Sequence, residues 1–391
     1  MLAKIIGIKN QSLGDKYLGA PIHFLKSKTQ THLSLLKSIE SRIASWSARS
    51  LSQAGRSTLV KHVGQAASLY QMASFLIPKN LCRKIDSHLC KFWWGESLNP
   101  NDKKLHLIAW DKICKPKAEG GLGFRKSDIN NLAMLARNVW KLVEDPNSFL
   151  ATTLKARYFR NSDFLQAKCP RNASWAWKCI HSIKEKIKPF ISWIVGDGQF
   201  IDPWCDHWIP EVGTATPKPN TVPNPNIRVA DFIEPISRSW DRNKLREHFD
   251  QSSIEKIVSI PLSNSPSSDR RAWDLTRDGR FTTKSAYVGF IGQHHVSNNV
   301  IWKHIWRTKV PHRIQLFAWK TLHNAIPVRE ILNHRILIDN PICPRCDGET
   351  ETALHALITC PGLSQIWSSN PLLLFPRFPS WGALHMGSMF Q

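Results

Sequence analysis

The chain has 391 residues, of which 42% are hydrophobic and 10% aromatic. This composition excludes an intrinsically disordered chain, which would have fewer aromatic side chains, and the length allows roughly two to three domains. Lysine and arginine number 53 against 30 aspartate and glutamate residues, a formal net charge of +23. Such an excess favours polyanionic partners, because each phosphate that a basic residue neutralises releases condensed counterions. A basic protein without such a partner is the alternative.

Neither a signal peptide nor a membrane span is predicted. Lys4 and Lys9 interrupt the N-terminal apolar run, and no uninterrupted apolar stretch is long enough to cross a bilayer. The nine cysteines are scattered apart from one C-terminal group, which is typical of a reducing compartment. We therefore expect an intracellular protein that is not secreted and has no membrane partner.

The N-terminal part of the chain is predicted to be helical after a short strand-and-turn segment. Apolar residues recur at helical spacing over three segments, at about 33–46, 52–76 and 81–94. Pro78 ends the second segment and Gly95 the third. Amphipathic helices with short connections can cover one another's apolar faces, so a helical bundle is expected here.

A basic loop punctuated by glycines, at residues 112–126, opens the next region. Helices are expected at about 127–144 and 177–187, because apolar residues recur there at helical spacing and a proline follows each segment. Residues 191–201 then predict a β-hairpin around Gly196-Asp197-Gly198.

Flexible stretches punctuate the rest of the chain. Residues 210–226 hold five prolines without strong periodicity, and residues 262–270 are rich in serine. A second hairpin is expected around Asp278-Gly279. Helices are expected at about 284–292, 311–322 and 327–334. The predicted fold class is therefore α+β and mostly helical, with short hairpins.

The strongest chemical motif is Cys343-Pro344-Arg345-Cys346 followed by His355 and Cys360, a spacing of C-x2-C-x8-H-x4-C. Zinc takes four such ligands in a tetrahedron, and a C-x2-C turn places two thiolates on one side of it. Residues 356–359 would form a helical turn that presents His355 and Cys360. Three thiolates and one imidazole leave no open position for water, so we predict one structural Zn²⁺ ion. Three unliganded thiols near a surface histidine are the alternative.

No aspartate cluster typical of a metal-dependent polymerase is found, since the chain has no Asp-Asp pair. Asp197, Asp202 and Asp206 lie close together in sequence, but their glycine and proline neighbours are typical of turns. Turn formation is therefore favoured over a catalytic role for these carboxylates.

The remaining cysteines are weaker metal-ligand candidates. Cys82 and Cys90 share a predicted helix with apolar neighbours, which favours buried core thiols. Cys205 and His207 could supply half of a metal site, but no second half is near in sequence, so packing is favoured.

Basic residues that are candidates for phosphate contact fall in three stretches. They are Arg56 and Lys61 in the bundle, Lys115, Lys117, Arg125 and Lys126 in the loop, and Lys309, Arg313, Arg335 and Arg345 around the zinc motif. A solvated face without a ligand is the alternative for each of them. The interleaved aromatic residues Trp302, Trp306, Phe317 and Trp319 could stack on bases, although their helical spacing favours core packing.

Seven blocks, in order along the chain, resemble the C-terminal half of plant LINE-type (non-LTR) retrotransposon reverse transcriptases. They are Lys16-Tyr17-Leu18-Gly19 with Pro21; Leu51-Ser52-Gln53-Ala54-Gly55-Arg56; Phe92-Trp93-Trp94-Gly95; Cys114-Lys115-Pro116-Lys117 with Gly120-Gly121-Leu122-Gly123-Phe124-Arg125; Gly196-Asp197-Gly198 with Trp204-Cys205-Asp206-His207-Trp208; Asp278-Gly279-Arg280-Phe281 with Lys284-Ser285-Ala286-Tyr287; and the segment from Trp302 to Trp367 that holds the zinc motif. Each block alone is weak, but the combination is specific.

The resemblance implies an order of domains. It consists of a palm-exit strand remnant at 1–27, a thumb-like helical region at 28–100, a connection region at 101–209, a linker-rich segment at 210–270, a reverse transcriptase zinc-binding domain at 281–367 and a tail at 368–391. The family's palm, with its aromatic-Ala-Asp-Asp signature, is expected upstream of Tyr17. The resemblance thus implies no polymerase, endonuclease or ribonuclease H active site in these residues.

We therefore expect a non-catalytic, zinc-containing fragment of a retrotransposon reverse transcriptase that binds RNA or DNA, mainly through phosphate contacts. Nuclear residence is inferred from what such elements do, and protein partners are not predicted. One alternative is a zinc-stabilised protein-interaction module or a functionless pseudogene fragment. Another is an enzyme, acting alone or as a trans-acting part of a polymerase.

Overall fold

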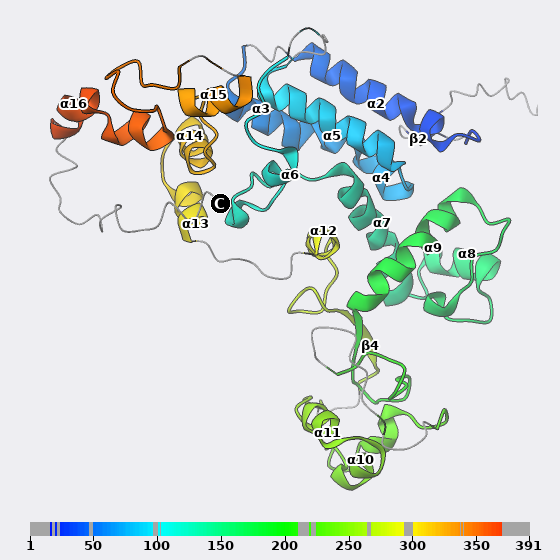
Figure 1. Cartoon of the computed structure of the whole chain (residues 1–391). Coiled ribbons are helices and arrows are strands. Elements are labelled where there is room, and N and C mark those ends of the chain that lie inside the picture. Colours follow the sequence, from blue (N-terminus) through cyan, green and yellow to red (C-terminus); the bar gives the residue numbers. More distant parts are fainter. Residues whose placement is uncertain are drawn as a thin grey trace, which may run out of the picture. The chain divides into compact units, whose positions relative to one another are not determined.

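The chain is described from a computed structural model, shown in Figure 1. The residues described are 16–17, 20–21, 24–46, 50–96, 101, 103–209, 219, 224–263, 267–292, 300–336, 338 and 340–369. Helices dominate this part of the chain, which confirms the predicted fold class. Two compact units are formed, the first by residues 1–51, 55–104 and 123–297 and the second by residues 52–54, 105–122 and 298–391.

Helices α2 (Lys28–Ser45) and α5 (Lys79–Trp94) confirm the first and third predicted helices. The side chain of Ser27 accepts a hydrogen bond from the backbone N–H of Gln30 and so caps the start of α2. Gly95 ends α5 in the left-handed conformation, at φ 88°. The two helices pack side by side in the first unit (Figure 1). Upstream, β1 (Lys16–Tyr17) pairs with β2 (Ala20–Pro21).

The prediction of one continuous helix over residues 52–76 is wrong. This segment is divided into α3 (Gln53–Leu59), a π-helical turn η1 (Val60–Gly64), a 3-10 turn η2 (Ala66–Ser68) and α4 (Leu69–Ser74). A Cβ atom on Gly64 would lie 2.5 Å from Leu89 Cδ2, so the glycine allows η1 to approach α5 closely. The π turn changes which residues face inward, and this change in period cannot be read from apolar spacing alone.

Helix α7 (Ser127–Glu144), which forms over the predicted residues, is central to the first unit. It packs against α4, α5, α9 (Trp175–Ile187) and α12 (Thr283–Ile291). The Asn131 side chain accepts a hydrogen bond from Ile77 N at 2.7 Å and donates to the carbonyls of Met72 and Phe75. These bonds satisfy backbone groups at the end of α4 and fix that segment against α7. Helix α8 (Phe149–Tyr158) follows.

Asp86 of α5 binds the start of α7. Its carboxylate accepts hydrogen bonds from the backbone N–H of Ser127, at 3.1 and 3.2 Å, and from the Ser127 hydroxyl at 2.6 Å. Burial raises the pKa of Asp86 to about 6, although the hydrogen bonds from Ser127 oppose this shift. The carboxylate is therefore a half-buried group whose ionisation is coupled to stability.

Asp86→Asn is expected to stabilise the first unit above pH 6 but not below pH 4. The folded-state pKa of Asp86 is raised above the ordinary 3.8, so its stabilising contribution is present at low pH and is lost as pH rises from 3.8 to about 6. An asparagine oxygen can still accept from Ser127. We expect the free energy of unfolding of Asp86→Asn, relative to the wild type, to rise by roughly 2 to 3 kcal/mol between pH 4 and pH 7. Urea denaturation at several pH values measures this difference, and a pH-independent difference contradicts the expectation.

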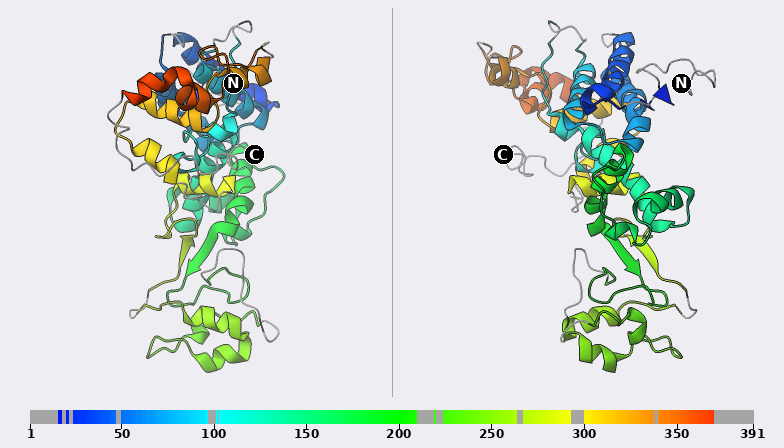
Figure 2. Two further views of the ribbon diagram at one scale, coloured as in Figure 1. Left: turned by 60° about the vertical axis from the view of Figure 1, so that its left-hand side comes forward. Right: turned by 90° about the vertical axis from the view of Figure 1, so that its right-hand side faces the viewer.

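Both predicted hairpins are wrong, because the structure has no strand at residues 195–201, or at residues 274–282 around Asp278-Gly279. Strand β3 (Ile191–Ile194) pairs antiparallel with β4 (Arg270–Trp273), with Ile191 opposite Trp273, so the two strands come from distant parts of the chain (Figure 2). The turn from Gly196 to Gly198 instead surrounds the carboxylate of Asp269. That carboxylate accepts hydrogen bonds from Gly196 N and Gly198 N, each at 2.8 Å. A side chain on Gly196 would overlap the backbone of residues 267–268, so this close approach requires glycine.

Residues 224–262 form a small core rather than a linker. Two helices, α10 (Arg242–His248) and α11 (Gln251–Val258), contribute to it, and so do the buried side chains of Trp208, Phe232 and Phe249. The proline-rich segment 210–226 lies mostly outside the described residues, as does the tail beyond residue 369. A folded segment with short helices therefore lies between the proline-rich and the serine-rich stretches of the sequence.

The second unit joins a segment that we name the strap, residues 105–122, to the C-terminal helices. The strap contains α6 (Trp110–Ile113) and a 3-10 turn, η3 (Lys117–Glu119), which packs against α13 (Val300–Arg307). Helices α14 (His312–Leu322), α15 (Arg329–Ile336) and α16 (Ser364–Ser368) follow, and α12, α14 and α15 confirm three predicted helices. None of the described helices has an apolar stretch long enough to span a bilayer.

The carbonyl of Gly120 holds the strap in place. Its oxygen accepts hydrogen bonds from Trp319 Nε1 and His323 Nε2, each at 2.6 Å. The rings of Trp302 and His323 stack, with centroids 4.8 Å apart, and Trp302 also covers the Cα of Gly120. Trp319 is fully buried and Trp302 half-buried, so both indoles act in packing, as their helical spacing predicts.

Candidate metal centre and basic surfaces

The first half of the metal site is a tight turn over residues 342–350. Its ends are joined by a bridge between Ile342 and Thr350, and the backbone N–H of Cys343 donates to Glu349 O at 2.8 Å. The N–H of Asp347 returns to Cys343 O at 2.9 Å, and Asp347 adopts the left-handed conformation at φ 50°. Aspartate tolerates this conformation better than most residues. The turn places both thiols of the C-x2-C motif on one side.

The second half is the π-helical turn η7 (His355–Thr359) with Cys360 after it. The N–H of Cys360 donates to His355 O at 3.1 Å, and the N–H of His355 donates to Thr352 Oγ1 at 3.0 Å. Ala356 and Leu357 of the same turn pack against Ile326, Val328 and Ile331. The apolar face of the turn thus anchors it in the second unit, while His355 and Cys360 face the first half of the site.

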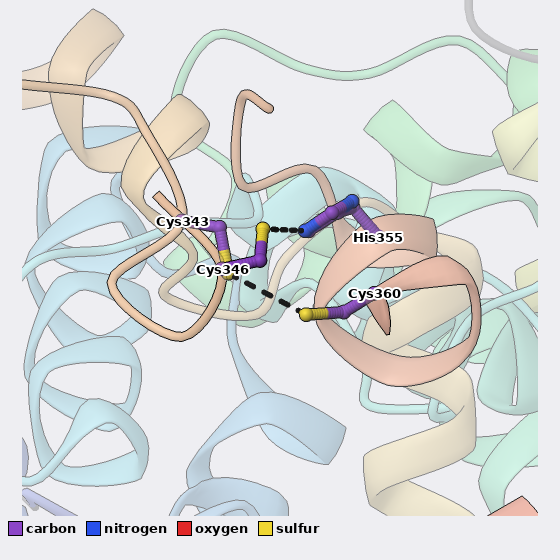
Figure 3. Close-up of side chains that lie close together, drawn as sticks. All are labelled: Cys343, Cys346, His355 and Cys360. Carbon is purple, nitrogen blue, oxygen red and sulfur yellow. Dashed lines mark hydrogen bonds between the residues drawn. The ribbon is translucent and has the colours of Figure 1, made fainter. Parts of the chain in front are cut away.

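The four ligand atoms converge on one point (Figure 3). All of them lie within 4.8 Å of one another. The Sγ atoms of Cys343 and Cys360 are 3.9 Å apart, and Cys346 Sγ is 3.3 Å from His355 Nε2. In a tetrahedron with Zn–S and Zn–N bonds of normal length, ligand atoms are separated by roughly 3.5 to 3.8 Å. The residues therefore fit one zinc ion, and the predicted ligand set of Cys343, Cys346, His355 and Cys360 is brought together.

The turn also favours the thiolate form of one ligand. Backbone N–H groups of Gly348 and Glu349 point at Cys346 Sγ and lower the pKa of this thiol to about 7. Cys343, His355 and Cys360 are almost completely buried, whereas Cys346 is partly exposed. Four protein ligands leave no open coordination position, so the metal has a structural role.

No cysteine outside the metal site belongs to another group of metal-ligating side chains within the described part of the chain. Cys82 and Cys90 are buried, as the helical pattern predicts, and burial raises the pKa of each thiol to about 12. Cys205 is exposed, and neither it nor His207 belongs to a group of metal-ligating residues among those described. Trp204 and Trp208, which flank them, are the buried members of that motif.

The clustered carboxylates hold the local backbone. Asp197 accepts a hydrogen bond from Gln199 N, and Asp202 accepts from the N–H groups of Trp204 and Cys205. The carboxylate of Asp206 accepts from Asp202 N at 2.9 Å and lies 3.8 Å from Arg271 Nη1. These bonds explain the turn-like sequence around all three aspartates.

Two candidate phosphate ligands of the bundle are half-buried. The guanidinium of Arg56 lies against Gly95, and burial lowers its pKa. The Nζ atom of Lys61 lies 5.5 Å from the centre of the Phe124 ring. Both residues thus make contacts within the fold, and their binding role stays a prediction.

Arg125 and Lys126, at the end of the glycine-punctuated loop, are also half-buried. Arg125 Nη1 donates to Asn130 Oδ1 at 2.9 Å, and its guanidinium lies 5.7 Å from the centre of the Tyr287 ring. The backbone N–H of Lys126 donates to the Tyr287 hydroxyl at 2.9 Å. This segment therefore links α7 to α12, and phosphate contact by either residue stays a prediction.

The candidate phosphate ligands of the second unit are exposed. They are Lys115, Lys117, Lys309, Arg313, Arg335 and Arg345. The ammonium of Lys117 lies 4.6 Å from the centre of the Trp306 ring, and Arg345 donates to Ala356 O at 3.2 Å. Their exposure is compatible with phosphate contact, which stays a prediction for these residues.

A basic stripe on α5 was missed by the sequence-based prediction. Lys79, Arg83 and Lys91 are exposed and recur at every fourth or eighth position, with the exposed Ser87 between them, and Lys84 is exposed beside them. We name Lys79, Arg83, Lys84 and Lys91 the α5 stripe. Positions four apart share one face of a helix, so the spacing held the necessary signal once the opposite face was assigned to the core.

Comparison with known proteins agrees with this metal site. Residues 281–367 match the family model for zinc-binding in reverse transcriptase. Over 85% of its length the chain is 28% identical to the Arabidopsis thaliana protein named "Putative ribonuclease H protein At1g65750". It spans 54% of that relative, about half its length. The chain is also 34% identical over 145 residues to "Uncharacterized mitochondrial protein AtMg00310" of Arabidopsis thaliana, 93% of which it covers.

The zinc ligands, the family match and these relatives define a class of protein that is derived from a reverse transcriptase and carries its zinc-binding domain. The chain belongs to this family of plant proteins, which are derived from reverse transcriptases. Helix α12, at the start of the matched region, packs against α7 in the first unit, whereas the metal ligands lie in the second.

Proposed function

We propose that this chain is a non-catalytic, nucleic-acid-binding part of a LINE-type (non-LTR) retrotransposon reverse transcriptase, held together at its C-terminal end by one structural zinc ion. It binds RNA or DNA through phosphates rather than through base edges. The name of the longer relative and the family match support a nucleic-acid partner, and the exposed basic side chains supply the means of contact.

The α5 stripe is the observation that carries this proposal. Residues 1–104 hold 16 of the 53 lysine and arginine residues but 5 of the 30 aspartate and glutamate residues, so this part of the sequence is poor in acidic residues that could neutralise the stripe. No member of the stripe forms an ion pair with an acidic side chain in the regions that the structure describes. Charges that are neither buried nor neutralised are free to replace the counterions of a phosphate backbone.

The second unit offers a further basic surface. Lys115 and Lys117 project from the strap, and Lys309 and Arg313 from the turn between α13 and α14 and the start of α14. Here too, none of the four forms an ion pair among the described residues. The metal does not touch the nucleic acid in this proposal, since its four ligands leave no open position. Its role is to keep these side chains on a folded scaffold.

Neutralising the α5 stripe is expected to weaken nucleic-acid binding and its salt dependence. We compare the wild type with a Lys79→Gln, Arg83→Gln, Lys91→Gln variant by fluorescence anisotropy on a labelled RNA and a labelled DNA duplex. The slope of log K against log salt should become less steep by about 2 to 3, because each lost contact removes roughly 0.7 to 0.9 from it.

The matched control removes three exposed positive charges elsewhere in the first unit, as Lys155→Gln, Arg242→Gln and Arg246→Gln. Net charge falls equally in both variants, so a general Coulomb effect would change both equally. The proposal requires a larger change for the α5 variant. Equal slopes for the two variants would remove α5 from the binding surface, and a wild-type affinity independent of salt would contradict phosphate binding altogether.

A zinc-stabilised protein-interaction module is the second candidate function. Leu354, Ile358 and Ile366 of the second unit are between 42% and 60% exposed. Exposed apolar side chains that gather in one region are typical of protein-interaction surfaces. Co-purification from nuclease-treated extract distinguishes the two functions. A partner retained by the wild type but lost in Ile358→Ser and Ile366→Ser favours this candidate.

A further inference from the structure

Glu349 contacts both halves of the metal site without belonging to the ligand set. Its backbone oxygen accepts the N–H of Cys343 at 2.8 Å, within the first half. Its side-chain Oε2 lies 3.0 Å from Nδ1 of His355, in the second half. The side chain of Glu349 is 74% exposed whereas that of His355 is 3% exposed, so the carboxylate reaches from the surface to a buried ring.

The direction of this hydrogen bond determines which histidine nitrogen faces the metal. An ionised carboxylate only accepts hydrogen bonds, so Nδ1 of His355 must carry the proton and donate it. The other nitrogen, Nε2, then has its lone pair free, and it is Nε2 that lies 3.3 Å from Cys346 Sγ among the four ligand atoms. A carboxylate on the opposite nitrogen also makes the imidazole a better electron donor.

We propose that Glu349 is a positioning residue of the zinc site, whose carboxylate fixes the tautomer and the ring orientation of His355 so that Nε2 binds the metal. Neither of the two neighbouring acidic side chains, Asp347 and Glu351, has this geometry. Asp347, two residues earlier, is exposed and is not bonded to His355, and Glu351 accepts the N–H of Arg329 at 2.9 Å. An ordinary exposed ion pair, by contrast, would contribute little.

The test measures zinc affinity of the full chain by competition with a chromogenic chelator. Glu349→Ala is expected to raise the zinc dissociation constant about 10- to 100-fold, which is the usual cost of losing such a partner. Glu349→Gln keeps an oxygen acceptor without the charge and should fall between this variant and the wild type. Asp347→Asn removes one negative charge from the same turn and should change affinity by less than about threefold.

Two spectroscopic readouts separate positioning from general damage to the fold. Cobalt-substituted protein should keep the absorption of a tetrahedral site with three sulfurs and one nitrogen in every variant. In the zinc-bound wild type, ¹⁵N NMR of His355 should show a protonated Nδ1 and a metal-bound Nε2. Unchanged affinity in Glu349→Ala, an effect of Asp347→Asn as large as that of Glu349→Ala, or metal bound to Nδ1 would each overturn the proposal.

Discussion

Replacing Cys343 with serine, or removing zinc with a chelator, is expected to unfold the metal-binding part of the second unit and leave the first unit folded. The apolar core beside the site has three buried members, Ile326, Val328 and Ile331, so residues 340–363 have little else to stabilise them. Metal binding in small zinc modules contributes on the order of 10 kcal/mol to folding, which exceeds what such a core supplies.

Hydrogen exchange with mass spectrometry measures this effect region by region, and elemental analysis reports the metal. We expect one zinc per chain in the wild type, a clearly lower content in Cys343→Ser, and rapid exchange over the turn and η7 in that variant. Helix α7 should keep its protection. Cys205→Ser, which alters an exposed thiol outside the site, is the control. Zinc-free protein with full protection of η7 would show that the four residues do not need the metal.

Gly120→Ala is expected to detach the strap from α14. Gly120 has φ 84°, and an added Cβ would lie 2.8 Å from Trp302 Cε2 and 3.0 Å from its Nε1. The strained backbone costs about 1 to 2 kcal/mol, and overpacking against the indole costs a further 1 to 3 kcal/mol or so. The hydrogen bonds from Trp319 and His323 to the Gly120 carbonyl would be strained as well.

Gly292→Ala is the matched control for this prediction. Gly292 has a similar conformation, φ 76°, but a Cβ added there would meet nothing within 4 Å. It should show the backbone cost alone, and only near the end of α12. Opening free energies from hydrogen exchange of α14 should therefore fall by roughly 2 to 5 kcal/mol in Gly120→Ala and stay unchanged in Gly292→Ala. Equal effects on α14 would mean that the strap does not stabilise it.

Helices with one uninterrupted apolar face could be predicted from the sequence. Helix α5 has its apolar residues at helical spacing between Pro78 and Gly95, and α7 forms over the residues expected. These features are local, so neighbouring residues suffice to predict them. The break at η1 could not be predicted, because it depends on the approach of Gly64 to Leu89, which is distant in sequence.

The pairing of strands that are distant in sequence could not be predicted from the sequence patterns. The segment Ile191–Ile194 and the turn after it have the appearance of a hairpin, yet β3 pairs with β4 some eighty residues later. The turn from Gly196 to Gly198 instead binds the carboxylate of Asp269 through its backbone N–H groups, and no local pattern indicates this contact. The contacts of the strap could not be predicted either, since the partners of Gly120 lie far away in sequence, in α14 and just after it.

The candidate site likewise has residues whose role could be predicted from the sequence and residues whose role could not. The four zinc ligands could be predicted, because their spacing in the sequence is typical of a zinc site. The role of Glu349 was not, because it depends on where the side chain points once the turn and η7 meet. For basic residues the sequence shows charge but not exposure, which is why the predicted phosphate ligands include the half-buried Arg56 but not the exposed Arg83.

Primer extension by the purified, zinc-loaded chain tests most directly whether it holds nucleic acid without copying it. The labelled primer–template is supplied with magnesium and all four nucleotides, at a protein concentration where complex formation is confirmed on a native gel. We predict a complex in which the primer keeps its original length. Primers lengthened in the order that the template dictates would contradict the proposed non-catalytic function.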